Sequence, residues 1–243
     1  MPRSAPNRRT VMIQFRDRGA RGHHRGALVD ARHSFSFGHY HDPKHMGFRS
    51  LRVINEDRVV PGAGFPDHGH ENMEIVTIVL QGRIRHRDSL GNEATIGAGD
   101  VQRMSAGTGV VHSETNPSEH ERAHALQIWI LPSEQGLPPS YEQKHFPPEQ
   151  GRNQFVAIAT RDGREGSVRL HQDAAIEIAR LDEGNILTRT LSPDRGYWVQ
   201  VIGGVIGLNG TEMREGDGAA MTGEALLSIE ADTDAELLLF DLQ

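Results

Sequence analysis

Two short segments of the sequence carry side chains that could bind a metal ion. These segments are His68-Gly69-His70 and His112-Ser113-Glu114. Each places two ligand-type residues at positions i and i+2, which point to the same side of an extended strand, about 7 Å apart. Two such strands facing each other would offer three imidazoles and one carboxylate to a single ion. This donor set suits Fe(II), Mn(II), Ni(II), Cu(II) or Zn(II). Among these ions we expect iron first, and Co(II) is a further candidate.

The metal hypothesis carries an expectation about pH. Imidazoles bind metal ions only in the neutral form, and the ordinary pKa of histidine is near 6.5. We therefore expect metal affinity to fall below roughly pH 6 if three histidines are ligands.

Other residues near these segments have less specific interpretations. His39 and His41 form another His-x-His pair, which we place in a loop at the rim of a pocket rather than in a separate metal site. His23 and His24 lie in a Gly- and Arg-rich stretch and are expected to be exposed. Glu74 could be a fifth ligand or a surface residue, but we favour an acceptor for the outer N–H of a ligating imidazole.

The surrounding segments predict short β-strands. Residues 74–80 are rich in β-branched side chains and end at Gln81-Gly82, and the turn at 88–92 separates two further short strands. More strands are expected at 101–104, 110–114 and 125–131. Strands of about five residues between Gly-rich turns are typical of a sandwich or jelly roll, so the expected class is all-β. Three large aromatic residues are expected in the core: Trp129, Tyr197 and Trp198.

The second half of the chain repeats the first without its ligands. Gly216-Asp217 parallels Gly99-Asp100, and Gly204 parallels Gly82 at the end of a strand. The residues then opposite His68, His70, His112 and Glu114 are Thr190, Ser192, Ile229 and Ala231. We therefore expect a second barrel without metal, and one ion per chain.

These patterns predict two barrels in one chain. Residues 1–11 would be a flexible extension, and 12–135 would form the metal-binding barrel. Prolines interrupt the segment 136–150, which we interpret as a linker, and 151–243 would form the degenerate barrel.

Composition excludes several classes of function. The 243 residues carry a net charge of −7, which argues against nucleic acid or an anionic membrane as the main partner. No apolar run approaches the ~18 residues needed to span a bilayer. Met1–Arg9 is basic but lacks the apolar segment of a secretory signal, so the cytoplasm is the expected location. The absence of cysteine excludes disulfides and thiolate metal sites.

The motifs resemble those of known families. Gly62-x5-His68-x-His70-x3-Glu74 resembles the first cupin motif, and Gly99-Asp100 followed by Gly109-x2-His112-x3-Asn116 resembles the second. More narrowly, the chain from about Met12 onward resembles the pirin family, above all its bacterial, quercetin 2,3-dioxygenase-like branch. The segments that carry this likeness are 33–37, 45–48, 51–55, 86–92 and 126–130.

The resemblance implies a fold, a site and a function. The fold would be a bicupin of two jelly-roll barrels, with the metal held by His68, His70, His112 and Glu114, whereas the family does not count the residue matching Glu74 as a ligand. The activity would be cleavage of the heterocyclic ring of a flavonol such as quercetin by O2, with release of carbon monoxide. Glu114, beside an open coordination position, would take the proton of the 3-hydroxyl.

Two other functions stay open at this stage, because a fold does not fix a function. One is a non-enzymatic, metal-binding regulatory module that contacts a protein partner, as animal pirins do. The other is a cupin isomerase or hydrolase, which would consume its substrate without oxygen.

Overall fold

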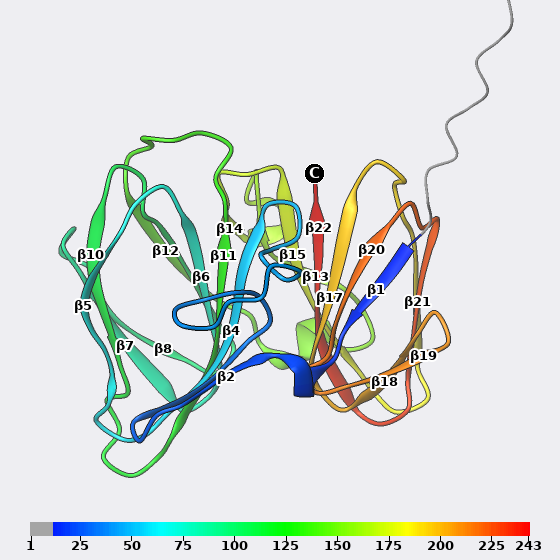
Figure 1. The fold of residues 1–243 in the computed structure, drawn as a ribbon, viewed down its shortest axis with the longest axis horizontal. Coiled ribbons are helices and arrows are strands. Elements are labelled where there is room, and N and C mark those ends of the chain that lie inside the picture. The colour runs from blue at the N-terminus through cyan, green and yellow to red at the C-terminus, as the bar shows by residue number, and fades with distance from the viewer. Residues whose placement is uncertain (1–11) are drawn as a thin grey trace, which may run out of the picture.

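The chain folds into two β-barrels that lie side by side (Figure 1). The computed structural model describes residues 12–243, so the predicted extension 1–11 lies outside the described residues. Between 12 and 243 the only helical elements are three 3₁₀ turns, η1 (Arg18–Ala20), η2 (Pro148–Gly151) and η3 (Arg164–Gly166). No helix in this range is long and apolar enough to cross a membrane. The predicted all-β class is confirmed.

The first barrel consists of a seven-stranded sheet, in the order β12-β9-β6-β11-β4-β3-β2, facing a four-stranded sheet, β5-β10-β7-β8. The strands are β2 (Gly22–Arg25), β3 (Val29–His33), β4 (Leu51–Val59), β5 (Gly64–His70), β6 (Glu74–Gln81), β7 (Arg83–Asp88), β8 (Glu93–Gly97), β9 (Asp100–Ser105), β10 (Val110–Thr115), β11 (Ala123–Ile130) and β12 (Ser140–His145).

The second barrel repeats this arrangement in its central strands, with sheets β1-β20-β17-β22-β15-β13-β14 and β16-β21-β18-β19, and differs at one edge, where β14 pairs parallel to β13. Its strands are β1 (Met12–Arg16), β13 (Val156–Thr160), β14 (Val168–Arg169), β15 (Ala174–Leu181), β16 (Ile186–Thr190), β17 (Gly196–Gly203), β18 (Val205–Leu208), β19 (Thr211–Arg214), β20 (Gly218–Thr222), β21 (Leu226–Ala231) and β22 (Ala235–Leu242). Strand for strand, β16 corresponds to β5 and β21 to β10.

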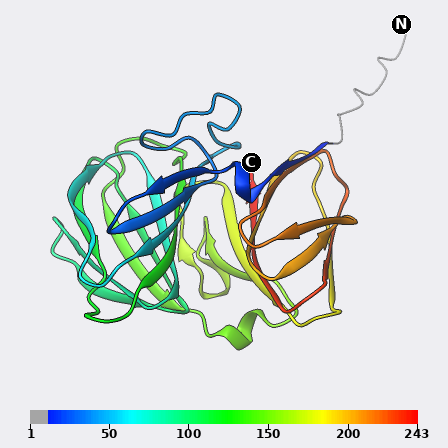
Figure 2. The same cartoon turned by 60° about the horizontal axis from the view of Figure 1, so that its bottom comes forward.

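Two edge strands differ from the predicted boundaries. The first strand of the chain, β1, pairs with β20 and so belongs to the second barrel, although it was assigned to the first. The segment interpreted as a linker contains β12, which pairs with β9 and completes the first barrel. Figure 2 shows the chain crossing from β1 to the first barrel at β2. Any extended segment can cover a free sheet edge, so local sequence does not reveal which edge it covers.

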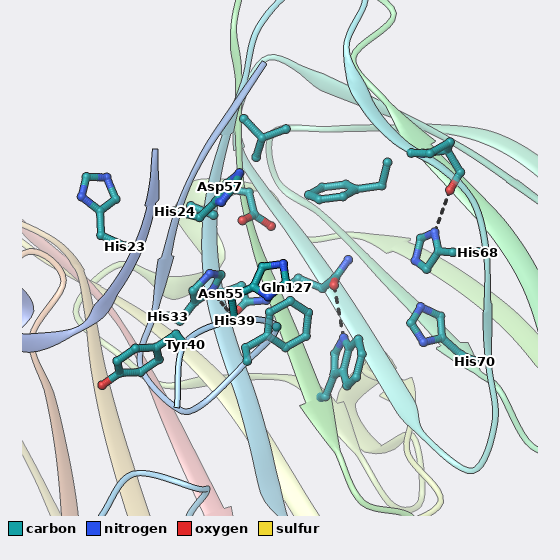
Figure 3. Close-up of a pocket in the computed structure, with 17 residues that line it drawn as sticks. His23, His24, His33, His39, Tyr40, Asn55, Asp57, His68, His70 and Gln127 are labelled. Carbon is teal, nitrogen blue, oxygen red and sulfur yellow. Dashed lines mark hydrogen bonds between the residues drawn. The ribbon is translucent and has the colours of Figure 1, made fainter. Parts of the chain in front are cut away.

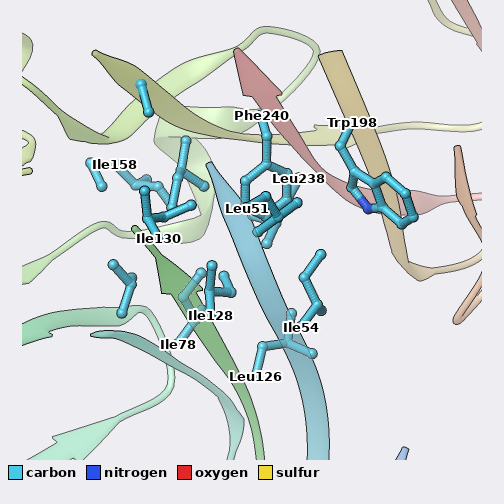
Figure 4. Close-up of a cluster of buried hydrophobic side chains, with 14 of the residues drawn as sticks. Leu51, Ile54, Ile78, Leu126, Ile128, Ile130, Ile158, Trp198, Leu238 and Phe240 are labelled. Carbon is cyan, nitrogen blue, oxygen red and sulfur yellow. The ribbon is translucent and has the colours of Figure 1, made fainter. Parts of the chain in front are cut away.

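The main core lies between the two seven-stranded sheets (Figure 4). Ile54 and Ile128 of the first barrel and Phe240 of the second are almost completely buried there. Because side chains alternate along a strand, Asn55 and Asp57 on β4 point the other way, into the first barrel. Tyr197 and Trp198 are buried, as expected. One face of each seven-stranded sheet therefore joins the barrels, and the other faces the interior of its own barrel.

Candidate metal centre

The strands β5 and β10 bring three histidines together. They pair antiparallel, with His112 directly opposite His68, and His70 lies two residues further along β5 on the same side. Gly64 allows the strands to approach, because a Cβ there would lie 2.1 Å from the carbonyl oxygen of Glu114. One ring nitrogen from each histidine lies within 4.8 Å of the others. The i, i+2 spacing in the sequence thus produces a triad.

The hydrogen bonds of the triad leave nitrogens free for a metal ion. Nδ1 of His68 donates to the carbonyl oxygen of Pro66 at 2.8 Å, so its Nε2 carries the lone pair. Nε2 of His112 lies 3.1 Å from Nε2 of His68, and Nε2 of His70 is buried with no hydrogen-bond partner among the described residues. Buried polar atoms rarely stay unpaired, so the free nitrogen of His70, within this group of three imidazoles, fits a site for a cation.

Burial also keeps two of these imidazoles neutral. It lowers the pKa of His70 to about 4, with a smaller contribution from the neighbouring His68. Burial and the adjacent histidines lower the pKa of His112 to about 3. Neutral imidazole is the form that binds a metal ion. At neutral pH the two rings therefore need not lose a proton before they bind a metal ion.

Glu114 lies next to the triad but is held by other partners. Its Oε1 accepts a hydrogen bond from Thr77 Oγ1 at 3.1 Å, and its Oε2 accepts one from Gln127 Nε2 at 2.6 Å. The carboxylate groups with His112 and His86, whereas His68, His70 and His112 form a separate group. Burial raises the pKa of Glu114. In this arrangement the carboxylate lies beside His112 and His86, outside the group formed by the three histidines.

His86 is a neighbour of the site that the sequence reasoning did not single out. Its Nδ1 accepts from Gln102 Nε2 at 3.1 Å, so its Nε2 donates to Asp88 at 3.0 Å. The ring lies 5.0 Å from that of Tyr141, measured between centroids. Both nitrogens are therefore occupied, and His86 supports the site rather than offering a ligand. The His86-x-Asp88 spacing, the same i, i+2 signal as in the triad, could have identified it.

A cavity of about 800 Å³ adjoins the triad (Figure 3). Figure 3 shows His68 and His70 on one side of it, and His33, Asn55 and Asp57 on the other. Its lining comes from β2–β5, β11 and the loop after β3: His23, His24, Val29, Ala31, His33, Phe37, Gly38, His39, Tyr40, Asn55, Asp57, Phe65, Pro66, His68, His70, Gln127 and Trp129. The cavity combines aromatic walls with hydrogen-bonding groups at both ends.

The lining corrects several expectations. His39 lies on the cavity, as expected for its rim, whereas His41 does not line it. His24 is exposed, as expected, and His23 is half-buried. Both also line the cavity, because β2 folds over the barrel, and this was not expected. Trp129 was expected in the core, yet it faces the cavity, and its ring lies 4.9 Å from that of His70.

Glu74 does not support the ligands. Its Oε2 accepts hydrogen bonds from Ser105 Oγ at 2.9 Å and from the backbone N–H of His171 at 3.1 Å. It shares the face of β6 that carries Val76, and this face packs against the second barrel. The favoured role as an acceptor for a ligating imidazole was therefore wrong, and Glu74 joins the two barrels.

A strand of the second barrel holds one wall of the cavity in place without lining it. Arg16 on β1 donates from Nη2 to the hydroxyl of Tyr40 at 2.7 Å, and from Nε to the carbonyl oxygen of Ser34 at 2.9 Å. This buried guanidinium thus fastens the loop that carries Phe37–Tyr40 to a strand of the other barrel.

Strand register shows what replaces the triad in the second barrel. If Ile229 matches His112, its partner Leu187 matches His68, and Arg189 matches His70. The expected matches Thr190 and Ser192 were wrong, because a fixed offset ignores the different lengths of the connecting turns. Ile229 and Ala231 are buried and apolar. Across residues 12–243, both candidate metal groups lie in the first barrel.

Comparison with known proteins agrees with this architecture. Residues 14–130 match the family described as Pirin, and residues 157–242 match the Quercetinase C-terminal cupin domain. A protein of Escherichia coli K12 named quercetin 2,3-dioxygenase is 44% identical over 95% of this chain and 99% of its own length.

Solved structures show the same relationship. The crystal structure of YhhW from E. coli superposes with a TM-score of 0.92 and 44% identity, covering 96% of this chain and 98% of its own. The structure of bacterial pirin YhhW in complex with nickel(II) gives a TM-score of 0.91 and 43% identity, over 95% of this chain and 99% of the other. Both halves of the sequence are covered, and the chain belongs to the pirin family.

Proposed function

We propose that this protein is a metal-dependent dioxygenase that opens the heterocyclic ring of flavonols such as quercetin with O2 and releases carbon monoxide. The observation that carries the proposal is the cavity beside the triad. Its aromatic walls, Phe37, Phe65 and Trp129, suit a planar aromatic ligand, and it reaches His68 and His70. The names of the relatives support an oxidoreductase.

In this proposal the protein binds one divalent ion through His68, His70 and His112, and Glu114, next to His112, is the expected fourth ligand. Iron was the first choice from the sequence, and the nickel complex of the relative makes nickel an equal candidate. When bound, such an ion supplies Lewis acidity and a template for the substrate oxygens.

The other residues bind the substrate and move a proton. Glu114 would accept the proton of the flavonol 3-hydroxyl, and Thr77 and Gln127 fix the direction in which its carboxylate points. The aromatic walls hold the ring system flat and exclude water from it. The cytoplasmic location and the absence of a nucleic-acid partner stay predictions.

Oxygen uptake tests the proposal. Protein stripped of metal would be reloaded anaerobically with Fe(II), Mn(II), Co(II), Ni(II), Cu(II) or Zn(II), and then mixed with quercetin in an oxygen electrode. We expect at least one metal to give one O2 consumed and one carbon monoxide released per quercetin. His68→Ala should abolish uptake, while His41→Ala, which alters a histidine outside the cavity lining, should not.

Two results would contradict the proposal. Loss of quercetin without oxygen uptake would indicate an isomerase or hydrolase. No turnover of any flavonol with any metal would favour a metal-binding regulatory protein.

A further inference from the structure

Asp57 is a buried carboxyl group that the proposed chemistry does not use. It lies on β4, is 6% exposed and lines the cavity. Its neighbours across the sheet are Ala31 on β3 and Ala125 on β11, whose methyl groups offer the carboxyl no hydrogen bond. Within residues 12–243 its side chain makes no hydrogen bond or ion pair with another side chain or the backbone. The group is therefore available to a ligand.

Keeping Asp57 in this position costs stability. A buried carboxyl without a partner loses its hydration without gaining a protein hydrogen bond. Burial, together with the carboxylates of Glu114 and Glu56, raises the pKa of Asp57 to about 8. A group held at such a cost is a candidate for function.

The second barrel shows that the fold does not need a carboxyl here. The turn Gly99-Asp100 of the first barrel corresponds to Gly216-Asp217 of the second. From this match, the registers of the paired strands identify corresponding positions on the central strands of the two large sheets. The position in the second barrel that corresponds to Asp57 is Ala179, which is fully buried. An alanine therefore satisfies the same position in a barrel of the same topology.

Asp57 lies at the end of the cavity away from the triad. Figure 3 shows it, with His33 and Asn55, across the cavity from His68 and His70. His33 and Asn55 are already hydrogen-bonded to each other at 2.8 Å. A planar ligand with one end at the triad would thus direct its other end toward a carboxyl group that is free to bond.

We propose that Asp57 determines specificity by hydrogen bonding to a phenolic hydroxyl at the end of the substrate remote from the metal. The preferred substrates would then be planar aromatics with a chelating pair of oxygens at one end and a hydroxyl group at the other. This inference rests on the proposed function and narrows it to hydroxylated flavonols.

Three flavonols test the inference, because they share the chelating 3-hydroxy-4-keto group and differ in the hydroxyls of the pendant ring. Quercetin carries two, kaempferol one and galangin none. Binding to the Ni(II)-loaded protein would be measured anaerobically by calorimetry. We expect wild type to bind quercetin about tenfold more tightly than galangin, the equivalent of one hydrogen bond to a carboxyl group.

Variants then assign this preference to Asp57. Asp57→Ala should bind quercetin and galangin equally, with galangin affinity and nickel content unchanged, and Asp57→Asn should keep part of the preference. Glu93→Gln, which alters an exposed carboxylate on β8, should behave as wild type. Thermal melts check folding, and Asp57→Ala should be at least as stable as wild type, because the unpaired carboxyl is removed.

The outcomes separate this inference from the proposed function. Equal affinity of wild type for all three flavonols, or a preference that survives in Asp57→Ala, would overturn the inference while leaving flavonol cleavage intact. Selective binding through Asp57 without oxygen uptake would overturn the dioxygenase proposal alone. No binding of any flavonol would overturn both.

Discussion

The two barrels share one topology and differ in what their interiors hold. In the first barrel, the inward positions that surround the site on the large sheet are polar: Asn55, Asp57, Thr77, Gln102 and Gln127. Strand register matches them to Glu177, Ala179, Val199, Ala219 and Leu239 in the second barrel. Four of the five polar positions have become apolar.

One polar pair remains in the interior of the second barrel, and it fills the region that corresponds to the metal site and cavity of the first. Arg189 takes the position of His70 and forms an ion pair with Glu177, which takes that of Asn55. The guanidinium also lies 4.3 Å above the ring of Phe155. A barrel of this topology is therefore stable when filled by aliphatic side chains and an ion pair. The polar interior of the first barrel is a feature of its site, not a requirement of the fold.

The largest expected effect comes from changing one matched position in both barrels. His112→Ala should abolish metal binding, because only two imidazoles of the triad remain. Any oxygen uptake should be lost with the metal. Ile229→Ala at the matching position should leave metal content per folded chain unchanged but lower the free energy of unfolding by about 2–4 kcal/mol, as expected for a cavity in a packed core. Plasma mass spectrometry and urea unfolding measure the two effects. Metal retention by His112→Ala would show that the first barrel does not bind the ion through this triad.

A second expected effect separates metal binding from chemistry in the first barrel. Glu114→Gln should keep more metal than His112→Ala, because the triad forms without the carboxylate. It should nevertheless lose about 100-fold or more of its flavonol turnover, the usual contribution of a positioned base. Metal content and oxygen uptake would be measured on the same preparation. Wild-type turnover in Glu114→Gln would show that the proton acceptor lies elsewhere.

A third variant tests the closure of the second barrel. Arg189→Ala leaves Glu177 largely buried and unpaired, so we expect a loss of about 1–3 kcal/mol of stability with unchanged metal content. The ion pair of Arg214 with Glu212 is exposed, so Arg214→Ala should change stability by less than about 0.5 kcal/mol. Chemical unfolding measures both. Equal effects would show that Arg189 is not needed to close the barrel.

The last expected effect concerns pH. The lowered pKa values of His70 and His112, about 4 and about 3, make the unfolded chain bind more protons than the metal-free folded chain below about pH 6.5. The stability that these residues contribute is complete above that pH and is lost as the pH falls toward 3.

The same shift changes the expectation for metal affinity. Protons should compete for these two ligands only near pH 4 and below, rather than below roughly pH 6 as their ordinary pKa suggested. Metal titrations at pH 7, 5.5 and 4 check this. A loss of affinity between pH 7 and 5.5 that requires more than one proton per bound ion would contradict the effect of burial on these two ligands.

Local patterns were enough to predict the fold class and the triad. The i, i+2 pairs on strands β5 and β10 specify which face the side chains share, and the Gly-rich turns specify short strands. The barrels to which β1 and β12 belong were not predictable, because pairing with a distant sheet edge leaves no local signal in the sequence. The placement of Glu74 depended on which face of β6 meets the second barrel, which the β-branched run around it does not reveal.

The cavity lining was the least predictable part. His23 and Trp129 reach the cavity through strand order and register, which single-sequence patterns do not give. Asp57 lies in a stretch that reads as an acidic surface turn, Asn55-Glu56-Asp57-Arg58, yet alternation along β4 directs Glu56 and Asp57 to opposite faces. That Asp57 has no hydrogen-bond partner becomes visible only from the strand register, which places it between two alanines.

The most direct test of the account is the amount of metal bound per chain after reloading with a single divalent ion and removal of the excess. We expect a ratio near one for wild type and near zero when His68, His70 and His112 are all replaced by alanine. A ratio near two, or a ratio near one in the triple variant, would show that the second barrel or another group binds the ion, and would contradict the division of roles between the barrels.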